Sequence, residues 1–350
     1  MNKLTTGYIS IVLLFLLTSC GNLIDEKYAA NLVKNKLYIP GNVTASVLKG
    51  GLSDSKIFRV TSESKNYVVR FLINKTLDER KIEIEALKRV SSSGYGPYIY
   101  YADIDKGVVI MEFLQNQNIS EELRNSESLY ILLANLLKNI HACHKTNLTD
   151  NNTKVFDDIY KDIQDLNNVS NQHIPLEKLL TITQIIQQAV TNHLTTALCH
   201  NDLNPNNILF LGNQFKAIDY EHAAQNEPYY DVATVAVFYC FRTSDEHLLL
   251  TRYLDKEPSA QAMSKLYLIE QLVWINYALA FLKMVPNILK QYQAVQVPSY
   301  WEIMEGIAEG KINLEDPENK LKYAKVLINN VISNSQTTEF NNAIKILNDK

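Results

Sequence analysis

The chain has 350 residues, of which 46% are hydrophobic and 21% charged, and its formal net charge at pH 7 is -4. These proportions are those of an ordinary globular protein, long enough for one large core or two joined lobes. The small negative charge argues against a nucleic-acid partner, because phosphate binding needs a strong basic excess. The four cysteines (Cys20, Cys143, Cys199, Cys240) include no CxxC pair, so they do not indicate a disulfide framework.

The first 21 residues differ from the rest of the chain. Lys3 precedes an apolar run from Ile9 to Leu17, which is too short to span a bilayer as a mature helix. Leu17-Thr18-Ser19-Cys20 then has the form of a lipobox. We therefore expect residues 1–21 to be a lipoprotein-type signal peptide, Cys20 to carry a lipid anchor, and the protein to be a membrane-anchored bacterial lipoprotein. If the start site is misassigned, a cytoplasmic location is expected instead.

Residues 25–114 have the pattern of a small β-rich lobe. Helices are expected at 25–36 and 76–93, with Ile82, Leu87 and Val90 of the second facing inward. Enrichment in β-branched and aromatic residues predicts strands in five segments: 46–49, 57–60, 67–71, 98–102 and 107–114. The sequence therefore predicts an α+β fold whose first lobe is a sheet.

The pattern changes to long helical stretches after Ser120. Three helices are expected, at 128–144, 176–195 and 265–290, the last with a late kink at Pro286. Strands and loops are expected over 197–222. The polar stretch 147–175 is either a loop or a helical insertion. Residues 115–350 thus form a large, mostly helical second lobe.

The segment HNDLNPNNIL, which begins at His200, carries the most informative pattern in the chain. Asn207 follows Asp202 by five residues, and Asp219 follows Asn207 by twelve. In phosphoryl transfer one carboxylate orients the attacking hydroxyl and accepts its proton, while an amide oxygen and a second carboxylate hold magnesium against the nucleotide phosphates. The alternative interpretation is an Asn/Asp-rich turn between strands.

These residues resemble the choline/ethanolamine kinase family, within the wider aminoglycoside-phosphotransferase and protein-kinase-like group. HNDLNPNNIL is similar to that family's catalytic loop, and IDYEHA, which contains Asp219, to its metal-binding strand. The resemblance implies a bilobal protein-kinase-like fold, with ATP bound by the lobe at 25–114. It also implies that Asp202 is the catalytic base, that Asn207 and Asp219 bind Mg²⁺, and that His200 shapes the catalytic loop.

The resemblance extends into the first lobe. Gly50, Gly51 and Ser53 match the family's nucleotide-covering turn, where glycine lets backbone N–H groups approach phosphate oxygens. Arg70 stands on the strand where these kinases place the cation that contacts the α- and β-phosphates. Its acidic partner is expected to be Glu83, with Glu85 as the alternative.

Two further positions match the family pattern. Met111-Glu112-Phe113-Leu114 resembles the hinge between the lobes, so the backbone around Glu112 is expected to meet the adenine. Asp231 matches an aspartate that precedes a helix, where it can cap the helix and brace the catalytic loop. By contrast, we interpret His141 and His144 as helix-end residues rather than as a metal site.

The acceptor pocket is expected on the long C-terminal helix. Trp274 and Tyr277 are three residues apart and share one helix face, where the family has two tryptophans that wall the site of a quaternary ammonium. Trp301 is a further candidate wall, and Glu221 is expected to add negative charge near the substrate. The alternative is that Trp274 and Tyr277 are core aromatics. Ethanolamine, thiamine and aminoglycosides also remain possible acceptors.

Two functions compete at this point. The first is an ATP- and Mg-dependent kinase that transfers the γ-phosphoryl group to the hydroxyl of a small amino alcohol, most simply choline or ethanolamine. The second is an exported lipoprotein that uses the same scaffold to bind a choline-like headgroup, as the leader favours. The complete set of Asp202, Asn207 and Asp219 favours the kinase, because a pure binder needs neither a base nor metal ligands. The oligomeric state is left open.

Overall fold

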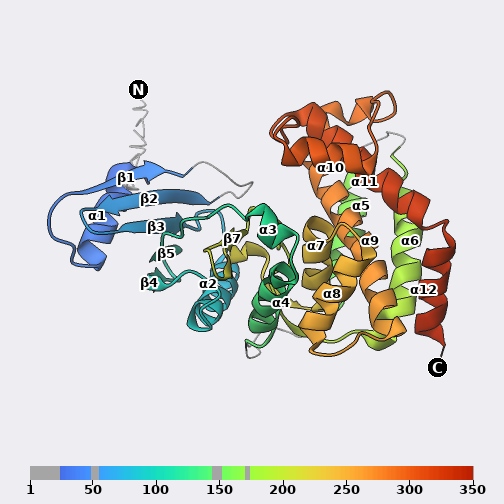
Figure 1. Ribbon diagram of the computed structural model, residues 1–350. Helices are drawn as coiled ribbons and strands as arrows, with labels where there is room; N and C mark the ends of the chain where they lie inside the picture. Colours follow the sequence, from blue (N-terminus) through green and yellow to red (C-terminus); the bar gives the residue numbers. More distant parts are fainter. Residues whose placement is uncertain (1–23, 49–54, 144–151, 170–173, 350) are drawn as a thin grey trace, which may run out of the picture.

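A five-stranded antiparallel sheet forms the first part of the molecule (Figure 1). The structure, a computed structural model, describes residues 24–48, 55–143, 152–169 and 174–349. The strands are hydrogen-bonded in the order β1-β2-β3-β5-β4. Their bounds are β1 Val43–Val47, β2 Lys56–Ser62, β3 Asn66–Phe71, β4 Ile99–Asp103 and β5 Val108–Glu112.

The two faces of this sheet belong to different cores. Side chains alternate between the faces of a strand, and in β5 Val108 and Ile110 join a small core with α1 (Glu26–Lys36). Val109 and Met111 point the other way, into the main core of the protein. The helix α2 (Leu77–Ser92) shares that main core and begins at a capping box between Thr76 and Glu79.

The second part is helical and is organised around α9 (Ala260–Lys283). This helix packs against α5, α6, α7, α11 and α12. The bounds of the remaining helices are α3 Glu121–Arg124, α4 Glu127–His141, α5 Lys154–Val169, α6 Leu176–Val190, α7 Tyr229–Tyr239, α8 Thr243–Leu254, α10 Tyr300–Ala308, α11 Pro317–Asn334 and α12 Thr338–Asn348. Within the described residues, no helix is long and apolar enough to cross a membrane.

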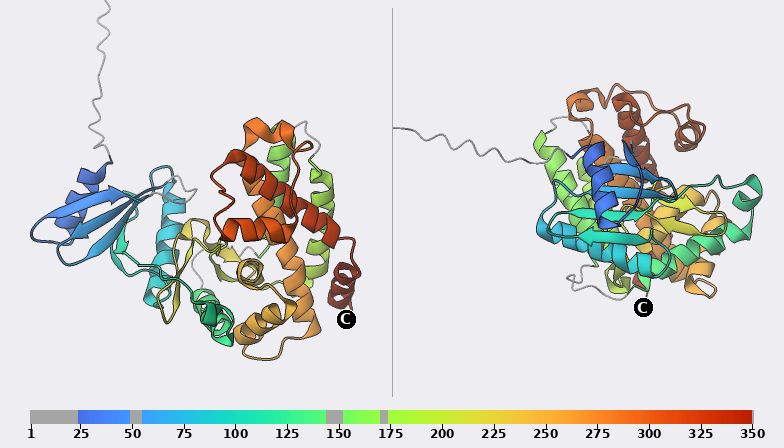
Figure 2. Two further views of the ribbon diagram at one scale, coloured as in Figure 1. Left: turned by 45° about the horizontal axis from the view of Figure 1, so that its top comes forward. Right: turned by 90° about the vertical axis from the view of Figure 1, so that its left-hand side faces the viewer.

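Two short strand pairs lie between the sheet and the helices, in the yellow segment of Figure 2, left. One pairs β6 (Ala197–Cys199) with β9 (Ala224–Asn226), and the other pairs β7 (Ile208–Phe210) with β8 (Phe215–Ala217). The single-turn helices η1 (Thr191–His193) and η2 (Tyr220–His222) flank them. The catalytic-loop sequence runs from β6 to β7, so both of its ends are held by paired backbone.

Two expectations about the helices need correction. Pro286 does not kink a continuous helix: α9 ends at Lys283, and Pro286 is the first residue of the separate two-turn helix η3 (Pro286–Gln291). Proline lacks the N–H that a helix interior needs, whereas a first helical position does not use it. Of the two alternatives for 147–175, the structure shows the helical one, with α5 at Lys154–Val169. In α2 Ile82 is only half-buried, and Ile84 lies inside with Leu87 and Val90.

Candidate active site

The catalytic loop is fixed to the helical part by Asp231. Its carboxylate accepts hydrogen bonds from the backbone N–H groups of His200 (2.7 Å) and Asn201 (2.8 Å), and Asn201 has a positive φ of 65°. Asp231 is fully buried in the first turn of α7, and its Oδ2 also lies 3.1 Å from His141 Nε2. The expected bracing is therefore present, although the N-cap residue of α7 is Pro228 rather than Asp231.

His200 supports the loop from within. Its buried ring donates from Nε2 to the carbonyl oxygen of Ile218 (2.8 Å), so Nδ1 is free to accept from the N–H of Asp202 (3.3 Å). A neutral imidazole has one donor and one acceptor nitrogen, and both are used here. His200 thus ties the start of the loop to the residue before Asp219 and has no proton-transfer partner in the site.

Asp202 is held by three side chains. Tyr277 Oη donates to its Oδ1 at 2.7 Å, as does Asn204 Nδ2 at 2.9 Å, while Asn207 Nδ2 donates to Oδ2 at 2.9 Å. Burial and the charge of Asp202 raise the pKa of Tyr277 well above its usual value, so the phenol stays a donor. Asp202 is half-buried, and its oriented carboxylate suits a general base.

Asn207 and Asp219 offer oxygen atoms suited to magnesium. The amide nitrogen of Asn207 is used twice by Asp202, at the backbone oxygen and at the carboxylate, and no described residue donates to its Oδ1. Asp219 follows β8 with a left-handed backbone (φ 65°, ψ 70°), a strained conformation for a non-glycine residue that is common at functional sites. An amide oxygen and a carboxylate are hard ligands of the kind that Mg²⁺ takes. The residues present therefore fit the ion.

Arg70 joins the two parts of the molecule through an ion network. Its guanidinium lies 3.1 Å from Glu83, 2.7 Å from Asp219 and 3.2 Å from Glu221, and Arg70 and Glu83 are 4% and 3% exposed. Burial opposes the charge, but Asp219, Glu83 and Glu221 outweigh it and raise the pKa of Arg70. The partner in α2 is thus Glu83.

Lys75 is a member of this network that the sequence did not indicate. Its ammonium lies 2.6 Å from Glu83 and 3.5 Å from Glu221. No motif marks Lys75, which stands in the turn before α2. Glu221 was expected near the acceptor, but the structure places its carboxylate between Arg70 and Lys75, on the side of the expected nucleotide phosphates.

Glu112 and the glycine-containing turn are the other residues expected beside the nucleotide. Glu112 is the last residue of β5; its N–H donates to the Tyr98 carbonyl oxygen (2.8 Å), and its carboxylate lies 3.4 Å from Lys216. Gly50, Gly51 and Ser53 lie outside the described residues, as do Cys20 and His144.

Trp274 and Tyr277 are both half-buried and share one face of α9, but they have different neighbours. The ring of Tyr277 meets Phe238 at 5.4 Å, and the ring of Trp274 meets Tyr300 at 5.7 Å. Tyr300 in turn contacts Trp301 at 5.2 Å. A row of rings, the aromatic row, therefore runs from Asp202 along α9 to the surface. It consists of Tyr277, Trp274, Tyr300 and Trp301, and Trp301 is 57% exposed.

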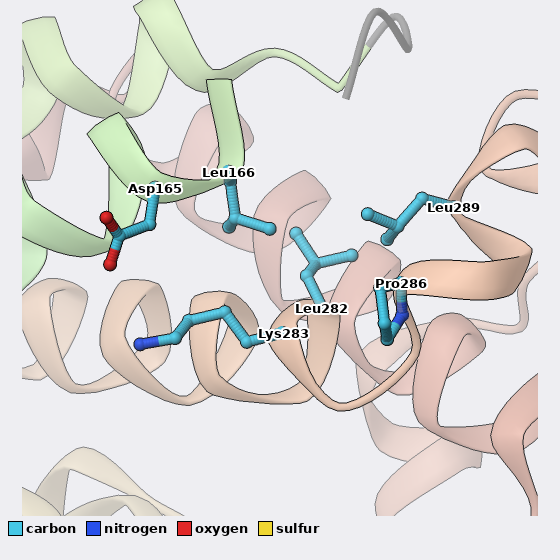
Figure 3. Close-up of a pocket in the computed structure, with 6 residues that line it drawn as sticks. All are labelled: Asp165, Leu166, Leu282, Lys283, Pro286 and Leu289. Carbon is cyan, nitrogen blue, oxygen red and sulfur yellow. The ribbon is translucent and has the colours of Figure 1, made fainter. Parts of the chain in front are cut away.

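A separate cavity of about 220 Å³ lies at the C-terminal end of α9, beside α5 and η3 (Figure 3). Its lining is mainly apolar and includes Leu166, Leu282, Pro286 and Leu289, with Asp165 and Lys283 at one side. None of the catalytic-loop or ion-network residues lines it, so it is not a candidate active site.

Comparisons with known proteins identify relatives of this chain. The chain is 24% identical over 191 residues to Protein LicA of Haemophilus influenzae, covering 53% of this chain and 56% of that protein. It is 27% identical over 211 residues to Ethanolamine kinase 1 of Homo sapiens, covering 55% of this chain and 46% of that protein. The chain thus spans about half the length of the curated relatives it matches.

Solved structures share the fold. A choline/ethanolamine kinase family protein from Mesorhizobium loti superimposes with a TM-score of 0.64 at 18% identity, covering 92% of this chain and 98% of that one. Choline kinase LicA from Streptococcus pneumoniae gives 0.56 at 19% identity, covering 81% and 97%. These matches confirm the expected α+β kinase-like fold. The family model described as "Phosphotransferase enzyme family" matches residues 44–263, more than half of the chain. The chain therefore belongs to the phosphotransferase enzyme family.

Proposed function

We propose that this protein is an ATP- and Mg-dependent kinase that transfers the γ-phosphoryl group to the hydroxyl of a small amino alcohol, choline or ethanolamine. One observation carries the proposal: the carboxylate of Asp202 is hydrogen-bonded on one side to Asn207, the expected metal ligand, and on the other to Tyr277 of the aromatic row. The same oriented carboxylate thus borders the phosphate side and the acceptor side.

Each residue of the site has its own role in an in-line displacement at the γ-phosphorus. Asp202 orients the acceptor hydroxyl and takes its proton as the oxygen bonds to the γ-phosphorus, and ADP leaves with the bridging oxygen and its electron pair. Arg70, held by Glu83, contacts the α- and β-phosphates. Magnesium held by Asn207 and Asp219 would neutralise charge on the phosphate oxygens.

The aromatic row supports a cationic acceptor. Rings attract ammonium groups through their quadrupole, and the attraction does not depend on hydrogen bonding. Trp274 lies one helical turn from Tyr277, and therefore beside the hydroxyl-binding end of the pocket. Names among the matched relatives, choline kinase and ethanolamine kinase, point to the same acceptor class.

The test is ADP release by the protein lacking residues 1–21, with Mg-ATP and choline, ethanolamine, thiamine or kanamycin. We expect turnover with choline or ethanolamine, and a fall of about 10²- to 10⁴-fold in Asp202→Asn with ATP binding retained. Asp105→Asn, a change at an exposed turn, is the matched control. Full turnover in Asp202→Asn would remove Asp202 from the role of base, and turnover with thiamine or kanamycin alone would contradict the acceptor class.

We also propose that residues 1–21 direct export and that Cys20 carries the lipid anchor. The lipobox form of the sequence supports this, and the residues lie outside the described part of the chain. Palmitate labelling that disappears in Cys20→Ala is the expected result. Labelling that is absent from the natural sequence, or that persists in the variant, would contradict it.

A further inference from the structure

A buried glutamate continues the aromatic row along α9. Glu270 precedes Trp274 by four residues and Tyr277 by seven, so the three side chains lie on one face of the helix. Glu270 is only 4% exposed, and its Oε1 is completely enclosed. No described residue donates a hydrogen bond to either oxygen or forms an ion pair with the carboxylate.

The surroundings of Glu270 are acidic and aromatic. Burial raises the pKa of Glu270 well above its usual value, and the carboxylates of Glu246 in α8 and Glu339 in α12 raise it further. The Glu270 charge also contributes, after burial, to the raised pKa of Tyr300, whose ring contacts Trp274. Among the described residues, Glu270 also contributes to the raised pKa of Tyr267 and of Cys240, and neither of these groups supplies a positive charge.

A buried carboxylate without a donor is costly unless a partner arrives. The partner that would relieve it is a cation, and the cation must also be compatible with the rings of Trp274 and Tyr300. An organic ammonium meets both conditions, because it is attracted to carboxylates and to aromatic faces. Glu270 and Trp274 are neighbours on the helix, about 5–6 Å apart between Cβ atoms.

From this arrangement, and resting on the proposed function, we infer that Glu270 is a specificity-determining residue that recognises the positive charge of the acceptor. The acceptor hydroxyl lies at Asp202 and its ammonium group lies toward Trp274, within the field of the Glu270 carboxylate. The rings provide the walls of the pocket, and Glu270 provides a carboxyl whose ionised form is disfavoured by burial in the free protein and is stabilised by the bound cation. Glu221 does not serve this purpose, because it is paired with Arg70 and Lys75.

The test compares charged and uncharged acceptors in Glu270→Gln, which keeps the size of the side chain and removes its charge. The acceptors are choline, ethanolamine and 3,3-dimethylbutan-1-ol, the neutral analogue of choline with carbon in place of nitrogen. We expect kcat/KM for the two cations to fall at least about tenfold, mainly through KM, and that for the neutral alcohol to change less than about twofold.

Two further variants serve as controls for this interpretation. Glu305→Gln removes an exposed carboxylate from α10 and is expected to change neither class of acceptor. Glu270→Asp keeps the charge but moves it by one methylene, and its effect on the cations is expected to be smaller than that of Glu270→Gln. An equal loss for charged and neutral acceptors in Glu270→Gln would show a structural role and overturn the inference.

Calorimetric titration of choline and ethanolamine without ATP separates this inference from the proposed reaction. Cation binding that Glu270→Gln weakens, without turnover of any acceptor, would support the site and refute the reaction. Turnover of both cations that is unchanged in Glu270→Gln would support the reaction and overturn the role of Glu270. Neither binding nor turnover in the natural sequence would overturn both.

Discussion

The ion network around Arg70 predicts unequal costs for removing its two buried members. Arg70→Met leaves Glu83 and Glu221 with Lys75 as a partner in the network, while Asp219 loses its contact with the guanidinium. Removing one partner of a buried ion pair costs about 3–5 kcal/mol, because a charge stays buried without compensation. We expect a loss of that order, since Asp219 Oδ1 loses the contact at 2.7 Å.

Glu83→Gln is the milder change. Arg70 keeps Asp219 at 2.7 Å and Glu221 at 3.2 Å, and glutamine fills the same volume and still accepts a hydrogen bond. We expect a loss of about 1–2 kcal/mol, the size of a charge-assisted hydrogen bond rather than of an orphaned charge. Glu85→Gln, at a half-buried position without an ion pair among the described residues, is the matched control and should stay within about 0.5 kcal/mol.

Urea denaturation at pH 7 without nucleotide or magnesium measures all three variants. The free energy of unfolding is extrapolated to water, and the m-values must agree for the comparison to hold. Equal losses in Glu83→Gln and Arg70→Met would refute the reasoning, because they would show that Asp219 and Glu221 do not compensate Arg70. A loss in Glu85→Gln as large as in Glu83→Gln would refute the assignment of the partner.

Two further predictions concern the acceptor side. Tyr277→Phe removes the 2.7 Å hydrogen bond to Asp202; we expect kcat to fall about 5- to 30-fold with the KM for ATP unchanged, and an unchanged kcat would contradict the positioning role of the phenol. The free energy of unfolding is expected to decrease as pH rises from about 4.5 to 7. Burial and neighbouring carboxylates raise the folded-state pKa of Glu246 to about 7, above its usual value of 4.5, so the stabilising proton is lost in that window. The loss is on the order of 1–3 kcal/mol. Glu246→Gln should flatten this dependence, and an equally steep slope in the variant would show that Glu246 is not its source.

The sequence predicted the parts of the site that are close together in the chain. Asp202 and Asn207 lie on the loop between β6 and β7, and Asp219 follows β8, which pairs with β7 so that the Ile218 N–H donates to the Asn207 carbonyl oxygen at 2.9 Å. The choice between Glu83 and Glu85 was different. These residues are two positions apart and point to opposite sides of α2, and the choice depends on which side Ile84 and Leu87 bury. Helix periodicity without a visible core could not decide it.

Contacts between distant segments were beyond the reach of sequence patterns. The bond between Tyr277 and Asp202 joins residues 75 positions apart, and the contact between Arg70 and Glu221 spans 151. Tyr277 was identified as a possible wall for an ammonium group, yet its hydroxyl also orients the expected base. Its second role depends on how α9 packs beside the catalytic loop, which no local pattern encodes.

Two buried ionisable residues of α9, Lys265 and Glu270, differ in whether the fold supplies a partner for them. Lys265 is 6% exposed, but its ammonium lies 3.0 Å from the buried Glu227 and donates to the His193 carbonyl oxygen at 2.5 Å. Its ammonium is thus paired within the fold, although burial outweighs the support from Glu227 and lowers the pKa of Lys265. Glu270, less than two turns later, is buried to the same degree with no donor among the described residues. A carboxyl group that the fold buries without a partner is expected to find one in a ligand, which is why Glu270 rather than Lys265 is assigned to the acceptor.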